Sequence, residues 1–93
     1  MRIEKYQSKY FKYLFVFDYT RDKVAFCQQL KLKYSFAAFN FVKEQEKIGW
    51  GFNSQTILNE ITSQYPEVRI EADLSELKDT IEPIYKNHQE NWI

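Results

Sequence analysis

The sequence predicts a single α+β domain, in which a β-α-β-β-α-β antiparallel sheet carries two helices on one face and is followed by a C-terminal helix. Short apolar segments rich in aromatic and β-branched residues, typical of strands, alternate with segments whose apolar residues recur at helical spacing. A chain of 93 residues can bury one modest core, and no repeat, linker or low-complexity tract interrupts it. This order of elements is the split βαβ arrangement.

The first predicted strand covers residues 13–19. It is apolar on both faces through Phe17, so we expect it inside the sheet rather than at an edge. The preceding residues 1–11 show no clear period, and they are interpreted as a lead-in segment or as an extra edge strand.

A helix is predicted over residues 21–32. Thr20 is a suitable N-cap residue, and Asp22 is favourably placed in the first turn. The apolar stripe of this helix consists of Val24, Cys27 and Leu30, with Ala25 and Phe26 beside it.

A hairpin is predicted next, with strands over 35–42 and 47–52 joined by the polar loop 43–46. Asn53 or Ser54 then begins a second helix, which stops at Pro66. Its expected buried face consists of Ile57, Leu58, Ile61 and Tyr65.

Residues 68–73 alternate between apolar and charged and predict a half-exposed last strand, which completes a domain over residues 12–74. The extension 75–93 is predicted to be helical, with Ser75 as its cap and a kink or break at Pro83. Its apolar stripe consists of Leu77, Ile81, Ile84, Tyr85, His88 and Trp92.

The sequence carries no recognisable catalytic machinery. It contains one histidine (His88), one cysteine (Cys27) and two glycines, which predicts neither a zinc site nor a glycine-rich phosphate loop. Both His88 and Cys27 are interpreted as structural residues. We therefore expect a protein that is not an enzyme and that uses no cofactor or metal. A single cysteine and the lack of any signal peptide or transmembrane stretch predict a cytoplasmic protein without membrane association.

Charge is unevenly distributed along the chain. Residues 1–50 contain ten basic and five acidic side chains, whereas residues 51–93 contain three basic and eight acidic ones. The N-terminal part could therefore present a basic surface to phosphate groups.

The segment 47–52 alternates Gly49 and Gly51 with Ile48, Trp50 and Phe52. In one interpretation the large side chains are buried under the helices, and the glycine face is open to a backbone or sugar-phosphate. In the other, the aromatic side chains face solvent as a base-stacking platform. Residues 14–16 and 49–52 do resemble the two short motifs of RNA-recognition motif (RRM) domains, which would make Phe15, Trp50 and Phe52 the stacking residues. We expect Trp50 to be buried, because outward rings would leave only glycine against the helices.

A second resemblance covers residues 12–74. The strand 15–19 (Phe-Val-Phe-Asp-Tyr), a helix, a hairpin ending in Trp-Gly-Phe at 50–52 and a helix ending near Pro66 resemble the HARP domain. They are also similar to the N-terminal domain of the phage T4 strand-annealing helicase and to the damage-recognition domain of XPB-type helicases. The resemblance implies a non-catalytic domain that helps a superfamily 2 helicase motor to engage branched or damaged DNA.

The leading hypothesis is thus a DNA-binding accessory domain of a helicase or ATP-dependent remodeller, acting on branched or single-stranded DNA with a motor in the same protein. One alternative is a protein-interaction module that docks through its acidic C-terminal half and the stripe from Tyr85 to Trp92. The other is an RRM-like binder of single-stranded RNA. The residues expected to contact phosphate are Arg21, Lys23, Lys43 and Lys47, with Lys31 and Lys33 as further candidates.

Overall fold

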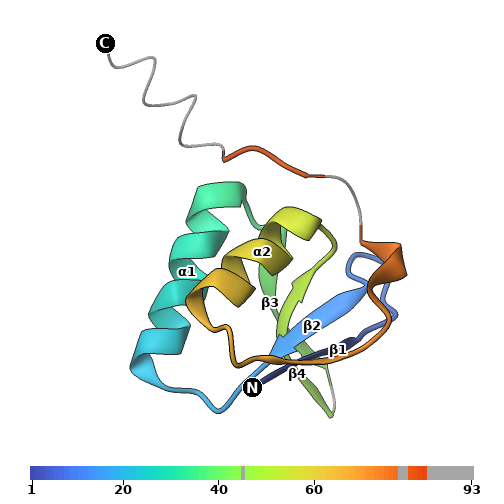
Figure 1. Cartoon of the computed structure of the whole chain (residues 1–93), viewed down its shortest axis with the longest axis horizontal. Coiled ribbons are helices and arrows are strands. Elements are labelled where there is room, and N and C mark those ends of the chain that lie inside the picture. The colour runs from blue at the N-terminus through green and yellow to red at the C-terminus, as the bar shows by residue number, and fades with distance from the viewer. Residues whose placement is uncertain (45, 78–79, 84–93) are drawn as a thin grey trace.

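Five strands form one sheet of order β3-β4-β2-β1-β5 in a computed structural model that describes residues 1–44, 46–77 and 80–83 (Figure 1). The helices α1 (Arg21–Tyr34) and α2 (Gln55–Gln64) lie on one face of this sheet. A short 3-10 helix, η1 (Leu74–Glu76), follows the last strand. The predicted α+β class is confirmed. The strands are β1 (Arg2–Lys5), β2 (Tyr13–Val16), β3 (Phe39–Glu44), β4 (Lys47–Phe52) and β5 (Arg69–Glu71).

The N-terminal strand β1 is the main departure from the prediction. It lies inside the sheet, antiparallel to β2 and parallel to β5, with Ile3 opposite both Phe15 and Ile70. The interpretation of residues 1–11 as a lead-in segment or edge strand is therefore wrong, and the sheet is mixed rather than antiparallel. Only Ile3 among the four residues of β1 is fully buried, so the strand leaves almost no hydrophobic pattern in the sequence.

Strand β2 lies between β4 and β1, as its two apolar faces predicted, but it ends at Val16 rather than at residue 19. The helix α1 begins directly after Thr20, as predicted. The hydroxyl of Thr20 does not cap the helix, because it donates to Oδ1 of Asp22 at 2.8 Å instead. The helix extends to Tyr34 and ends at Ser35, whose φ of 114° is incompatible with a helix.

The predicted strand over 35–42 begins late. Residues 35–38 form a loop, and β3 runs from Phe39 to Glu44, whereas β4 has the predicted bounds. Ser54 caps α2, since its hydroxyl accepts the N–H of Ile57 at 3.2 Å. The last strand is shorter than predicted and covers only Arg69–Glu71.

Two apolar clusters lie on opposite faces of the sheet. The larger one packs Ile3, Phe15 and Phe52 against the helices. The smaller one consists of Tyr6, Phe11, Leu14 and Val42. Because Tyr6 and Phe11 flank the turn between β1 and β2, this turn folds over the sheet face that the helices leave uncovered.

The C-terminal extension contains no α-helix where the structure describes it, although Ser75 and Glu76 belong to η1. Asp73 rather than Ser75 caps η1, by accepting the N–H of Ser75 at 3.1 Å, and residues 80–83 have no regular structure. The predicted α-helix is wrong for residues 75–77 and 80–83, the part of the extension that the structure describes. Pro83 disfavours the helical conformation in the residue before it. The other residues of the predicted stripe, Ile84, Tyr85, His88 and Trp92, lie outside the described residues.

Candidate nucleic-acid interface

The hairpin tryptophan is part of the core. Trp50 is 5% exposed, stacks on Phe39 with ring centroids 5.2 Å apart, and meets Phe41 edge-on at 5.7 Å. The predicted burial of Trp50 is confirmed. Phe15 and Phe52 are fully buried as well, so the three residues of the RRM-like stacking platform are not available to a base.

The glycine face of β4 is also occupied. A Cβ atom on Gly51 would lie 2.9 Å from Cβ of Phe11 and closer still to its ring, and one on Gly49 would lie 2.7 Å from Cγ of Leu14. The expectation of an open face for a backbone or sugar-phosphate is therefore wrong. The two glycines instead make room for side chains of the smaller apolar cluster.

The uneven charge of the chain is partly neutralised inside the fold. Nζ of Lys33 lies 2.6 Å from Glu60, Nε of Arg2 lies 3.9 Å from Glu71, and Lys5 pairs with Glu76. Each of these ion pairs joins a basic residue of the N-terminal part to an acidic residue of the C-terminal part. A count of charges along the sequence therefore overstates the basic surface.

The carboxylate of Glu60 accepts a second hydrogen bond besides that from Lys33. The hydroxyl of Tyr34 donates to Oε2 of Glu60 at 2.7 Å. Burial raises the pKa of the Glu60 carboxyl, but the hydrogen bonds from Lys33 and Tyr34 outweigh it and hold this pKa below the ordinary value. Burial, together with the adjacent carboxylate, raises the pKa of Tyr34 to about 12.

This lowered pKa predicts a pH dependence of stability. The ionised Glu60 stabilises the fold above the pKa of an unfolded glutamate, about 4.3, and this contribution is lost as the pH falls through the lower pKa of the folded state. We expect Glu60→Gln to reduce the Tm at neutral pH, and the deficit to shrink in melts at acidic pH. Glu67→Gln, at an exposed position, is the matched control. Its difference in Tm from the unmodified protein should be the same at neutral and at acidic pH. A loss of Tm in Glu60→Gln that does not change with pH would contradict the lowered pKa of Glu60 in the folded protein.

The predicted phosphate-contacting residues lie at two ends of the domain. Arg21 and Lys23 begin α1, and Lys43 and Lys47 flank the β3–β4 turn at the same end, where Tyr19 contacts Phe41 with ring centroids 6.1 Å apart. Lys31 and Lys33 lie in the last turn of α1, about 20 Å away for a helix of this length.

At the first of these ends, acidic or aromatic groups lie close to the predicted phosphate-contacting residues. Nζ of Lys47 bonds to Glu4 at 3.3 Å, and the ammonium of Lys23 lies over the ring of Tyr65. The four predicted phosphate-contacting residues at this end are matched in number by acidic residues of the same segments, which are Asp18, Asp22, Glu44 and Glu46.

The opposite end holds a pocket of about 470 Å³, which we call the aromatic slot. Tyr10 and Phe36, from two different connecting segments, are 70% and 68% exposed at this pocket. The segments that form it, residues 8–12 and 31–40, contain four lysines and no acidic residue. These lysines are Lys9, Lys12, Lys31 and Lys33, of which Lys33 is paired with Glu60 of α2. The slot is lined by Tyr10, Phe11, Phe36, Ala37 and Asn40.

Hydrogen bonds fix the turn that carries Tyr10. The hydroxyl oxygen of Ser8 accepts the N–H groups of Tyr10 and Phe11 at 3.2 and 2.9 Å. The side chain of Asn53 donates to the carbonyl of Tyr10 at 2.5 Å and accepts the N–H of Lys12 at 2.6 Å. These four hydrogen bonds hold the backbone on this side of the slot. The sequence-based prediction missed this site, although two lysines flank two aromatic residues over residues 9–12.

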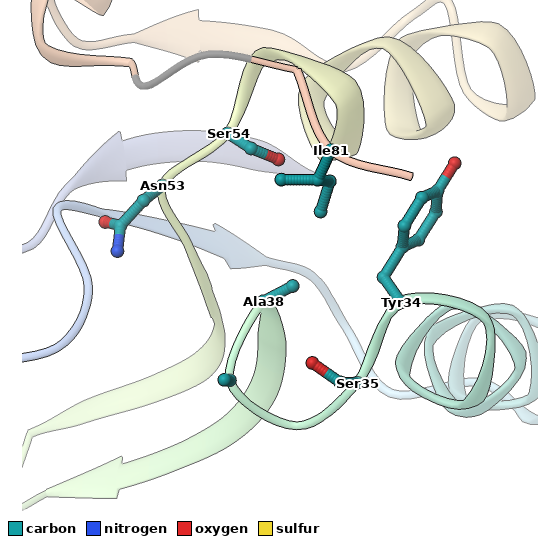
Figure 2. Close-up of a pocket in the computed structure, with 7 residues that line it drawn as sticks. Tyr34, Ser35, Ala38, Asn53, Ser54 and Ile81 are labelled. Atoms are coloured by element: carbon teal, nitrogen blue, oxygen red, sulfur yellow. The ribbon is translucent and has the colours of Figure 1, made fainter. Parts of the chain in front are cut away.

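A second pocket, of about 330 Å³, lies on the other side of the loop 35–38 (Figure 2). It is bordered by the end of α1, the start of α2 and Ile81 from the C-terminal segment. Figure 2 shows Ile81 between Ser54 and Tyr34. The residues that line this second pocket are Tyr34, Ser35, Ala37, Ala38, Asn53, Ser54 and Ile81.

Comparisons with known proteins add no assignment, since no family model, no curated protein and no solved structure matches the chain. The part of the chain that the structure describes contains no helix that is long and apolar enough to cross a bilayer. Cys27 is fully buried, which confirms it as a core residue, and burial raises the pKa of its thiol to about 12.

Proposed function

We propose that the chain is a non-catalytic accessory domain that binds single-stranded DNA through the aromatic slot. The observation that carries the proposal is the pair of exposed rings, Tyr10 and Phe36, at one pocket whose flanking segments also carry Lys9, Lys12 and Lys31. Aromatic side chains beside positive charge are the usual means of holding unpaired nucleotides, because every base offers a face for stacking.

In this proposal one base enters the slot and stacks on Tyr10 or Phe36. The ammonium of Lys9, which lies 5.6 Å from the centroid of the Tyr10 ring, contacts a flanking phosphate together with Lys12 and Lys31. The hydrogen bonds that hold the backbone of Tyr10 reduce the entropy lost on binding. The four basic residues at the other end contribute little, because acidic neighbours offset their charge.

The accessory role is supported by the resemblance to HARP-like domains. The residues that carry this resemblance include Phe15, Trp50 and Phe52, which are core residues, so the resemblance assigns no DNA contacts. Beside a superfamily 2 helicase motor, a domain that binds one unpaired nucleotide would hold the single strand of DNA at a branched junction.

The proposal predicts that Tyr10→Ala and Phe36→Ala each weaken binding of a labelled single-stranded oligonucleotide. The loss of one stacked base is worth about 1–3 kcal/mol, a factor of about 5 to 150 in Kd. Fluorescence anisotropy at several salt concentrations measures the effect. With three phosphate contacts the slope of log affinity against log salt is about −2, and Lys9→Gln should reduce its magnitude by about 0.7.

Two matched controls locate the site. Leu32 is exposed on α1 outside the slot, and Tyr19 is exposed at the opposite end, so Leu32→Ala and Tyr19→Ala should bind like the unmodified protein. Lys43→Gln should leave the salt slope unchanged. If Tyr19→Ala and Lys43→Gln lose affinity while the slot variants do not, the other end binds DNA. Absence of binding at low salt rejects the proposal.

A second candidate function is protein interaction at the opposite end. Tyr19, Phe41 and Ile48 are each exposed there, where acidic residues of the same segments offset the four predicted phosphate-contacting residues. Neighbouring exposed apolar side chains without excess charge favour a protein contact over a phosphate backbone. In that case the slot variants bind oligonucleotides no more weakly than the controls do.

A further inference from the structure

Asn40, on strand β3, brings a side-chain amide to the aromatic slot. It lies opposite Gly51 and two residues before Val42, which belongs to the smaller apolar cluster. Because side chains alternate along a strand, Asn40 is on the same face of the sheet as that cluster. Phe11 covers Gly51 on this face, so Asn40 and Phe11 are neighbours in the lining of the slot.

The two ends of the Asn40 amide are not equivalent. Its Oδ1 accepts the backbone N–H of Phe41 at 3.0 Å. This contact identifies the oxygen end of the amide, since the NH₂ end cannot accept a hydrogen bond. Among the described residues, Nδ2 of Asn40 has no hydrogen-bond partner, so its two N–H groups are left for a ligand.

The slot therefore offers hydrogen-bond donors to the edge of a stacked base. The other polar side chain in its lining is Tyr10, whose hydroxyl both donates and accepts and so does not discriminate between bases. An unrestrained asparagine favours adenine, because it donates to N7 and accepts from the N6 amino group. At Asn40 the oxygen is bound to Phe41, and the donating Nδ2 is matched by a carbonyl oxygen instead.

We infer that Asn40 is a specificity-determining residue of the slot and that it favours thymine over adenine. Thymine presents the carbonyl oxygens O2 and O4 and carries no amino group, whereas the amino group of adenine would face the donors of Nδ2. The inference rests on the proposed function, because it assigns a base preference to the site of Tyr10 and Phe36. One neutral hydrogen bond gives a ratio of about 2 to 10 between the two Kd values.

Anisotropy titrations with labelled oligo-dT and oligo-dA of equal length measure this ratio. Asn40→Asp keeps an oxygen for the N–H of Phe41 but replaces the donors by an acceptor. We expect its negative charge to weaken the binding of both oligonucleotides and its acceptor to reverse the ratio in favour of adenine. Asn59→Asp is the matched control, since Asn59 is exposed on α2 and its Oδ1 also accepts a hydrogen bond, from Gln55 at 2.9 Å. It adds the same charge and should leave the ratio unchanged.

Asn40→Ala separates base recognition from a structural role. It removes both the donor and the oxygen bound to Phe41, and it should lose the preference for thymine without gaining one for adenine. A purely structural role would weaken the binding of both oligonucleotides by the same factor in both Asn40 variants, and that result overturns the inference. Equal binding of oligo-dT and oligo-dA by the unmodified protein overturns it as well.

Failure of the inference is distinguishable from failure of the proposed function. If Tyr10→Ala weakens the binding of both oligonucleotides while the Asn40 variants keep the original ratio, the slot binds DNA and only the role of Asn40 is rejected. If neither oligonucleotide binds at low salt, or if Tyr10→Ala binds both like the unmodified protein, the proposed function is rejected and the inference with it.

Discussion

Trp50→Ala is expected to destabilise the domain by about 3–5 kcal/mol, the usual cost of removing a large buried aromatic side chain. The indole is 5% exposed and is packed against Phe39 and Phe41. Natural domains are stable by only about 5–15 kcal/mol, so a small domain should lose much of its cooperative folding. Circular dichroism during urea denaturation measures the change.

Trp50→Phe is the matched control. The indole N–H has no hydrogen-bond partner among the described residues, so its removal sacrifices no hydrogen bond. The smaller ring leaves a modest cavity, and we expect a loss well below that of alanine. If Trp50→Ala melts like the unmodified protein and loses only RNA affinity, Trp50 faces solvent and the RRM-like interpretation is restored.

The parts of the fold that could be predicted from the sequence are those with strong local patterns. Alternation of large and small residues fixed the bounds of β4, and the helical spacing of Ile57, Leu58 and Ile61 identified the buried face of α2. β1 could not be predicted, because one buried residue among four gives no period. Its place between β2 and β5 depends on contacts with residues more than 60 positions away, such as Ile70.

The candidate site depends even more on tertiary structure. Tyr10 and Phe36 are 26 positions apart and meet only because the turn before β2 and the loop after α1 lie at the same end of the sheet. The basic character of the N-terminal half was visible in the sequence. The pairing of Lys33 with Glu60 was not, and neither was the covering of Gly51 by Phe11. Both are long-range contacts that no local pattern encodes.

Gly51→Ala should destabilise the domain by about 1–3 kcal/mol, the usual cost of overpacking a well-filled site. The new methyl group would lie 2.9 Å from Cβ of Phe11, so the whole side chain must move and not only the end of its ring. The backbone of Phe11 is tied to Ser8, and the next residue, Lys12, is tied to Asn53. The gain from a less flexible unfolded chain, about 0.4–1 kcal/mol, offsets the cost only in part.

A double-mutant cycle with Phe11→Ala tests this contact. Removing the Phe11 ring clears most of the space above Gly51, so the cost of Gly51→Ala should fall in the Phe11→Ala background and can change sign. The expected coupling is about 1–3 kcal/mol, in the range for residues in direct contact. Denaturation midpoints of the four proteins measure it. An equal cost in both backgrounds would show that Phe11 does not cover this face, and the glycine face would then be open to a ligand as the sequence first suggested.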